Sequence, residues 1–97
     1  MQFNHLEEEL EVLEEVLVEE VDNEAVRDLV VFNDDINTFD HVISTLVKVC
    51  KHSQEQAEQC TWLIHYKGKC TVKNGIWNEL VPMRQGLVDA GINAEIL

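Results

Sequence analysis

The chain has few basic residues, and they are unevenly placed. Of its 97 residues only seven are Lys or Arg, against 19 Asp or Glu, and the net charge is −12. Residues 1–26 hold ten of the acids and no Lys or Arg, whereas residues 27–97 carry nine acids against seven bases. Without a basic stripe the chain cannot displace counterions from phosphates, so we expect no DNA or RNA partner.

Long apolar runs are also missing. No segment approaches the roughly 18 to 20 apolar residues that span a bilayer, and Met1 to His5 lack the basic start and apolar stretch of a secretory signal. We therefore expect a cytoplasmic protein without membrane association. A chain of 97 residues is long enough for one small domain with a modest core.

The usual signatures of enzymes and metal sites are absent. Cys50, Cys60 and Cys70 show no CxxC pairing and no nearby His at zinc-ligand spacing, so we interpret them as small buried hydrophobes. No nucleophile elbow or phosphate-cradling glycine loop is present. We expect neither enzyme activity nor a cofactor nor a metal. The enzyme-like alternative is a metal site formed by Asp34, Asp35, His41 and His65.

The N-terminal part of the chain is an acidic amphipathic segment. Apolar residues recur at helical spacing, with Glu at most positions between them, at Leu6, Leu10, Leu13, Leu17 and Val21. This pattern predicts a helix with one apolar stripe that needs a surface to cover it, because its carboxylates repel one another. Asp22-Asn23-Glu24 breaks the pattern, which divides the chain into an N-terminal extension of residues 1–26 and a core of residues 27–97.

The first half of the core predicts a strand followed by two helices. Leu29 to Phe32 is short, branched and apolar, as a buried strand should be, and Asn33-Asp34-Asp35 ends it in a turn. Thr38 can cap a helix that runs to Cys50. Ser53 and Gln56 form a capping box for a second helix, which Gly68 ends in the left-handed conformation.

The second half predicts strand, helix and strand. Cys70 to Val72 is a short strand and Asn74-Gly75 a turn. A third helical face begins near Trp77, and Pro82 either kinks this helix or marks the first turn of its main segment. Gly91 ends it, and Ile92 to Leu97 is a final edge strand. The order β-α-α-β-α-β predicts an α+β domain, with a small three-stranded antiparallel sheet covered on one face by three helices.

Two motifs in this core resemble the ClpS family of Clp protease adaptors. The first is Asn33-Asp34-Asp35, followed by Thr38-Phe39 and Val42, and the second is His65-Tyr66-Lys67-Gly68-Lys69. The resemblance covers roughly Asp28 to Leu97. It implies a non-enzymatic protein that binds destabilising N-terminal residues (N-degrons) and delivers their bearers to a Clp protease. The C-terminal domain of the ribosomal stalk protein shares the general architecture, so the motifs and not the fold point to an adaptor.

The resemblance also implies a role for each motif residue. The α-ammonium group would be bound by Asn33, Asp35 and His65, with Asp34 close by at the rim. The side-chain pocket would be lined by Asn37, Thr38, Phe39, Val42, Thr61 and Ile64. Many family members carry Met at the positions of Phe39 and Thr61, which alters the pocket's shape. We expect Leu, Phe, Tyr and Trp as first residues of the substrate, and Trp62 and Trp77 as packing residues.

Several alternatives stay open at this stage. The implied partner is a hexameric Clp ATPase of the ClpA or ClpC type, toward which the acidic segment would act as a delivery arm. The segment equally fits a solvated helix packed on its own domain or on a second copy, and then the protein would be a structural interaction module that oligomerises through it. His65 alone would fit a histidine stabilised by the dipole at a helix end.

Overall fold

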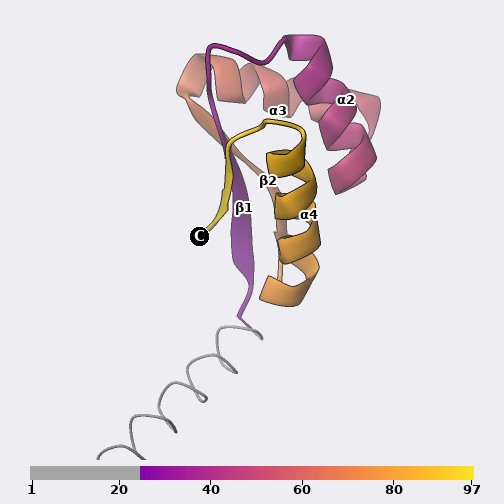
Figure 1. Cartoon of the computed structure of the whole chain (residues 1–97), viewed down its shortest axis with the longest axis vertical. Coiled ribbons are helices and arrows are strands. Elements are labelled where there is room, and N and C mark those ends of the chain that lie inside the picture. Colours follow the sequence, from indigo (N-terminus) through magenta and orange to yellow (C-terminus); the bar gives the residue numbers. More distant parts are fainter. Residues whose placement is uncertain (1–24) are drawn as a thin grey trace, which may run out of the picture.

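A computed structural model of the chain describes residues 25–97, and the predicted acidic helix lies outside them. Three helices and a three-stranded antiparallel sheet with strand order β2-β1-β3 make up this part. Figure 1 shows α4 running alongside the sheet and α2 and α3 gathered at one end of it. The elements are β1 (Arg27–Phe32), α2 (Phe39–Cys50), α3 (Gln54–Lys67), β2 (Lys69–Gly75), α4 (Trp77–Asp89) and β3 (Ala94–Ile96). The predicted α+β fold is confirmed.

The helix boundaries follow the predicted capping residues. The Thr38 hydroxyl accepts from the His41 amide at 3.1 Å, and the Ser53 hydroxyl accepts from the Gln56 amide at 3.1 Å. Each bond satisfies one of the free amides in the first turn of a helix. Gly68 ends α3 with a φ of 89°, a conformation that a side chain would oppose.

One detail of the predicted elements is wrong, and one open alternative is decided. Asn74-Gly75 is not a turn, because β2 continues through both residues, and the Asn74 side-chain amide donates to the Asp28 carboxylate on β1. Of the two alternatives for Pro82, the structure removes one, because the proline lies inside α4 and not in its first turn. The proline therefore leaves the Asn78 carbonyl without its usual amide donor within the helix.

The core lies between the sheet and the helices. Leu29 and Val31 point from β1 into it, whereas Val30 belongs to the opposite face of the pleat and is not part of this cluster. From the helices, Leu46 on α2 and Leu80 and Leu87 on α4 are completely buried in the same core. The linker between α2 and α3 is held by the buried His52, whose Nε2 donates to the Val72 carbonyl at 2.6 Å.

The cysteines are packing residues to different degrees. Cys50 is buried, while Cys60 and Cys70 are partly buried against the core, and all three are free thiols. Burial raises the pKa of Cys50 to about 11 and that of Cys60 to about 12. Both thiols therefore stay protonated at neutral pH, which removes the nucleophilic thiolate form. Within residues 25–97, no helix has the length and apolar character needed to cross a membrane.

Gly86 allows α4 to approach α2 closely. A Cβ atom at this position would lie 2.9 Å from Val49 Cγ1 and 3.2 Å from Val49 Cγ2. Valine is stiff about its first side-chain torsion, so these methyl groups cannot simply swing away. The contact therefore requires a residue without a side chain at this point.

We predict that Gly86→Ala lowers the free energy of unfolding by up to about 2 kcal/mol. Alanine would gain about 1 kcal/mol from helix propensity, but overpacking costs about 1 to 3 kcal/mol. Adding Val49→Ala should make Gly86→Ala stabilising, because the obstructing methyl groups are then gone. Urea denaturation of the two single variants and the double variant measures this coupling. Additive effects in the double variant would contradict the close approach.

Candidate functional site

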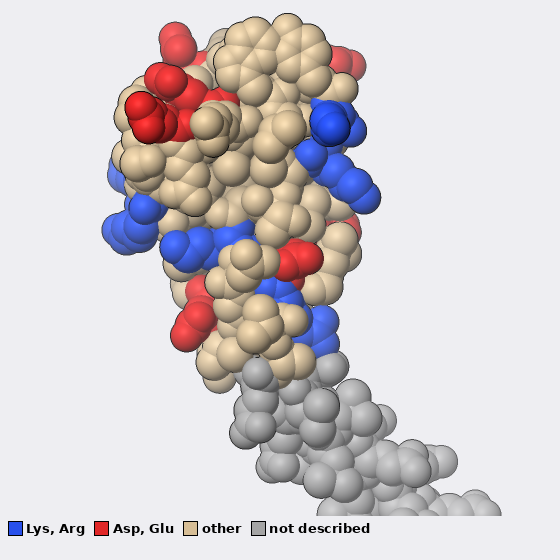
Figure 2. Space-filling model, turned by 180° about the vertical axis from the view of Figure 1, so that it is seen from behind, with Lys and Arg blue, Asp and Glu red and all other residues tan. Residues whose placement is uncertain are grey.

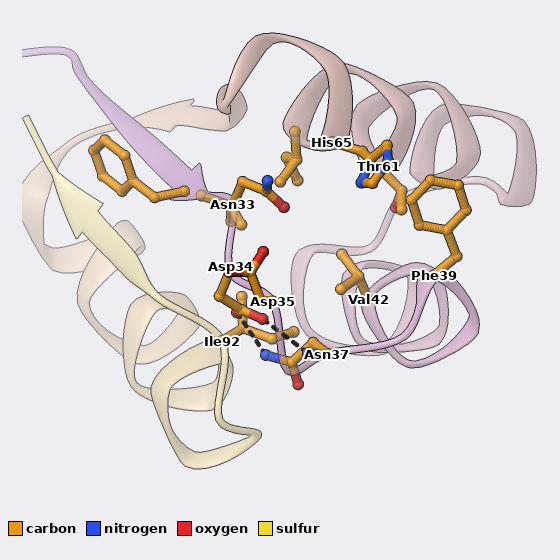
Figure 3. Close-up of a pocket in the computed structure, with 12 residues that line it drawn as sticks. Asn33, Asp34, Asp35, Asn37, Phe39, Val42, Thr61, His65 and Ile92 are labelled. Carbon is orange, nitrogen blue, oxygen red and sulfur yellow. Dashed lines mark hydrogen bonds between the residues drawn. The ribbon is translucent and has the colours of Figure 1, made fainter.

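A pocket of about 260 Å³ opens where β1 ends, between α2 and α3. Figure 3 shows Thr61 and His65 projecting from α3, Phe39 and Val42 from α2, and Asn33, Asp34 and Asp35 from the loop after β1. The lining comprises Val31, Phe32, Asn33, Asp34, Asp35, Asn37, Phe39, Val42, Thr61, Ile64, His65 and Ile92. The two sequence motifs therefore line one cavity, although about 30 residues separate them.

Main-chain hydrogen bonds at the end of β1 bring the two motifs together. The Asn33 amide donates to the Gly68 carbonyl at 2.8 Å, directly after α3, and the Phe32 amide donates to the Asn93 carbonyl at 2.9 Å. Because Gly68 follows the last turn of α3, the first bond places Asn33 beside the end that carries His65. Strand pairing and the glycine cap thus fix the relative positions of the two motifs.

The carboxylate of Asp34 holds the loop in shape. Its Oδ1 accepts from the amides of Ile36 and Asn37, each at 2.8 Å, and its Oδ2 accepts from Asn37 Nδ2 at 2.7 Å. The bond from the Asn37 amide is the main reason that the pKa of Asp34 is lowered from its ordinary value of 3.8. Asp34 lines the pocket, but its oxygens are already committed to the loop.

The same loop and the first turn of α2 position the turn between α4 and β3. Asn37 Nδ2 donates to the Gly91 carbonyl at 2.8 Å, and His41 Nε2 donates to the Ala90 carbonyl at 2.8 Å. These bonds hold the start of the segment that inserts Ile92 into the pocket wall, where it is 2% exposed. Ile92 therefore reaches the site from a third part of the chain.

The pocket has an apolar floor and a polar rim. Val42, Thr61, Ile64 and Ile92 are all buried, and the Thr61 hydroxyl donates to the Ala57 carbonyl at 2.7 Å within its own helix. That bond leaves no unsatisfied hydroxyl in the floor. At the rim Asn33, Asp35 and His65 are exposed, and within residues 25–97 their side chains make no hydrogen bonds. The rim thus offers free polar groups above a surface that suits an apolar side chain.

The structure differs from two expectations about this region, the place of Thr38 in the pocket and the alternative metal site. Thr38 is not part of the pocket lining, because its hydroxyl caps α2. The four residues of the alternative metal site do not form a metal-binding group, and no three His, Cys, Asp or Glu side chains do so in the described part of the chain. His41 points its Nε2 at Ala90, and Asp34 is bound by its own loop.

Three lining residues were missed by sequence reasoning. Val31 and Phe32 were assigned to the buried strand, and Ile92 to the edge strand after α4. Their apolar character gave no sign of a pocket, because strand residues of this kind normally face the core. The contact of Asn37 with Gly91, which brings Ile92 to the site, spans 54 positions in the sequence.

Comparison with known proteins identifies the family. The family model described as "ATP-dependent Clp protease adaptor protein ClpS" matches residues 22–90. The chain belongs to the ClpS family. A comparison with curated protein sequences gave no match.

A solved ClpS structure shares the fold. The structure of Agrobacterium tumefaciens ClpS2 bound to L-phenylalaninamide matches with a TM-score of 0.64 and 16% sequence identity, over 76% of this chain and 99% of that chain. Members of the ClpS family are adaptors of the Clp protease, and this is the function class that the chain shares with them.

We predict that Asp34→Ala lowers the free energy of unfolding at pH 7 by about 1 to 2 kcal/mol, since hydrogen bonds to a charged group are lost at a partly exposed site. A lowered pKa means that this contribution is present above the ordinary pKa of 3.8 and disappears as pH falls through the native value. The difference between wild type and variant should therefore shrink in acid. Urea denaturation at pH 7 and pH 3 measures it.

Asp35→Ala serves as the control. The Asp35 side chain is exposed and makes no hydrogen bond within residues 25–97, so its removal should leave the unfolding free energy within about 0.5 kcal/mol of wild type. A larger loss for Asp35→Ala than for Asp34→Ala would contradict the division of roles between the two carboxylates.

Proposed function

We propose that this protein captures substrates by a destabilising, large hydrophobic N-terminal residue and delivers them to a Clp ATPase and protease. The observation that carries the proposal is the set of free polar groups at the rim, Asn33, Asp35 and His65, above an apolar floor. An N-terminal residue differs from the same residue inside a chain by its ammonium group. A protein that distinguishes the two needs acceptors beside a side-chain pocket.

The rim supplies such acceptors in three chemical forms. Asn33 offers an amide carbonyl, Asp35 a carboxylate, and neutral His65 a nitrogen lone pair. Hydrogen bonds from an ammonium group to these atoms are charge-assisted and roughly twice as strong as neutral ones. Asp34 contributes indirectly by holding the loop that carries its two neighbours.

The pocket suits one side chain. Its volume of about 260 Å³ lies below the roughly 300 to 1,000 Å³ of pockets that hold drug-sized ligands. The apolar floor favours Leu, Phe, Tyr or Trp, and the bound L-phenylalaninamide of Agrobacterium ClpS2 is an amino acid amide with a free ammonium group and a side chain of this class. Phe39 and Thr61 stand where many family members carry Met, so the order of preference depends on this chain's own pocket.

Delivery completes the proposed function. The protein itself catalyses no reaction. A hexameric ATPase of the ClpA or ClpC type uses ATP to unfold the delivered substrate in the cytoplasm. The family description supports a Clp protease partner. The alternative of an interaction module that oligomerises through residues 1–26 concerns a segment that lies almost wholly outside the described residues.

We predict that a peptide with a free N-terminal Phe binds and that its acetylated form binds at least about 100-fold more weakly. Acetylation removes the charge and adds bulk where Asn33, Asp35 and His65 converge, and charged hydrogen bonds are worth about 1.5 to 3 kcal/mol each. Fluorescence anisotropy with the matched peptides measures the ratio. Equal affinities would show that the site does not recognise N-termini.

We predict that His65→Ala weakens binding of the free Phe peptide by about 10- to 100-fold, because one acceptor for the ammonium group is lost. His65→Gln keeps a carbonyl acceptor at the same position and should recover part of the affinity. The comparison separates hydrogen bonding from packing, since both substitutions remove the imidazole ring. Identical losses in the two variants would argue against His65 as an acceptor.

We predict that a chain beginning near Glu24 still captures the peptide but no longer supports delivery, because every proposed pocket residue lies after that position. Peptide binding and degradation of a reporter by the Clp protease measure the two steps separately. A truncated chain that folds but fails to bind the free Phe peptide would show that the acidic segment belongs to the pocket.

A further inference from the structure

Four aromatic rings form a closed cluster beside the pocket mouth, which we call the aromatic platform. Trp62 and Tyr66 stack with centroids 4.7 Å apart and planes inclined by 4°. Phe39 meets Trp62 edge-on at 5.5 Å, and His65 meets Phe39 at 5.0 Å and Tyr66 at 5.2 Å. Each ring of the platform thus contacts two others.

The platform is exposed, contrary to the expectation that Trp62 is a packing residue. Trp62 is 50% exposed and Tyr66 is 68% exposed, and both project from the same face of α3. Figure 2 looks at the molecule from the side opposite to Figure 1, where uncharged side chains cover the upper end between acidic and basic groups. Leaving the apolar surface of stacked aromatic side chains in water is unfavourable in free energy. An exposed group of such side chains therefore indicates a surface that contacts a ligand or partner.

The platform is continuous with the pocket. Phe39 and His65 line the pocket and also belong to the platform, whereas Trp62 and Tyr66 lie outside the lining. Across the mouth from His65 lies the loop that carries Asp34 and Asp35 (Figure 3). Aromatic rings therefore border the pocket mouth on one side and an acidic loop on another.

Chain geometry brings the next residues of a bound substrate to this surface. Successive Cα atoms lie about 3.8 Å apart, so the second and third residues leave the mouth within about 8 Å of the first. The platform's rings are spaced by 4.7 to 5.5 Å and begin at the rim itself. An apolar side chain in these positions is therefore within reach of the exposed rings.

We propose that the aromatic platform is a second subsite, which binds an aromatic or large apolar side chain at the second or third position of the same substrate. The inference rests on the proposed function, because it takes the first residue to be held in the pocket. Recognition would then extend beyond the N-terminal residue, and substrates sharing that residue would be ranked by the residues that follow it. Pairs of aromatic rings contribute enough to change affinity by about 3- to 10-fold.

Three peptides and two variants test this proposal. The peptides begin Phe-Ser-Ser, Phe-Trp-Ser and Phe-Ser-Trp, and are otherwise identical. In wild type, at least one Trp peptide should bind about 3- to 10-fold more tightly than Phe-Ser-Ser. This ratio should fall to about one in Trp62→Ala and persist in Trp77→Ala, the matched control, because Trp77 is 39% exposed but lies on α4 with its ring over Arg27.

The outcomes distinguish this inference from the proposed function. Suppose that Phe-Ser-Ser binds, that its acetylated form does not, and that the Trp peptides bind no more tightly than Phe-Ser-Ser. This result supports the pocket as the site for the first residue and overturns the platform subsite. A gain that survives Trp62→Ala also overturns it. If no free Phe peptide binds, the proposed function itself fails. Sedimentation of wild type and Trp62→Ala tests whether the platform instead pairs two copies, and a dimer that only Trp62→Ala abolishes would overturn the subsite.

Discussion

The hydrogen bonds of the Asp34 carboxylate are the constraint on which the site depends. Its oxygens close the loop after β1 by accepting from Ile36 and Asn37, and Asn37 in turn donates to Gly91. One carboxylate therefore fixes the loop on which Asn33 and Asp35 are carried and, through Asn37, the turn that brings in Ile92. Asp34 thus supports the loop through three hydrogen bonds, whereas the side chains of Asn33 and Asp35 make none within residues 25–97. Adjacent residues of one motif thus serve different purposes.

Elsewhere in the site too, some polar groups support the structure and others are free to bind a ligand. Groups that could compete with a ligand are satisfied internally: the Thr61 hydroxyl bonds to its own helix, and His41 bonds to the turn after α4. The free groups at the rim stand on the loop after β1 and on the last turn of α3, and the bond between Asn33 and Gly68 joins the start of this loop to the end of α3. Acceptors on such rigid elements need little reordering when they bind a cation, which preserves affinity.

Most of the fold can be predicted from the sequence because the residues that begin and end its helices act locally. The boundaries of α2 and α3 follow from Thr38, Ser53 and Gly68, whose roles depend only on nearby residues. The turn expected at Asn74-Gly75 is wrong because a distant partner decides there: Asn74 stays in β2, where it pairs with Asp28. Most residues that line the pocket are expected from the family resemblance. Ile92 is not, because it is held at the pocket through the hydrogen bond between Asn37 and Gly91, which lie 54 positions apart. The exposure of Trp62 depends on which face of α3 the other elements leave uncovered.

Recognition of a substrate by its N-terminal residue can be measured with a peptide array that varies only this residue. We expect strong binding for peptides that begin with Leu, Phe, Tyr or Trp, and weak binding for small, acidic or β-branched first residues, because the pocket is apolar and holds one side chain. Uniform binding across all first residues would rule out such recognition, since neither the pocket nor the rim would then be selecting its ligand.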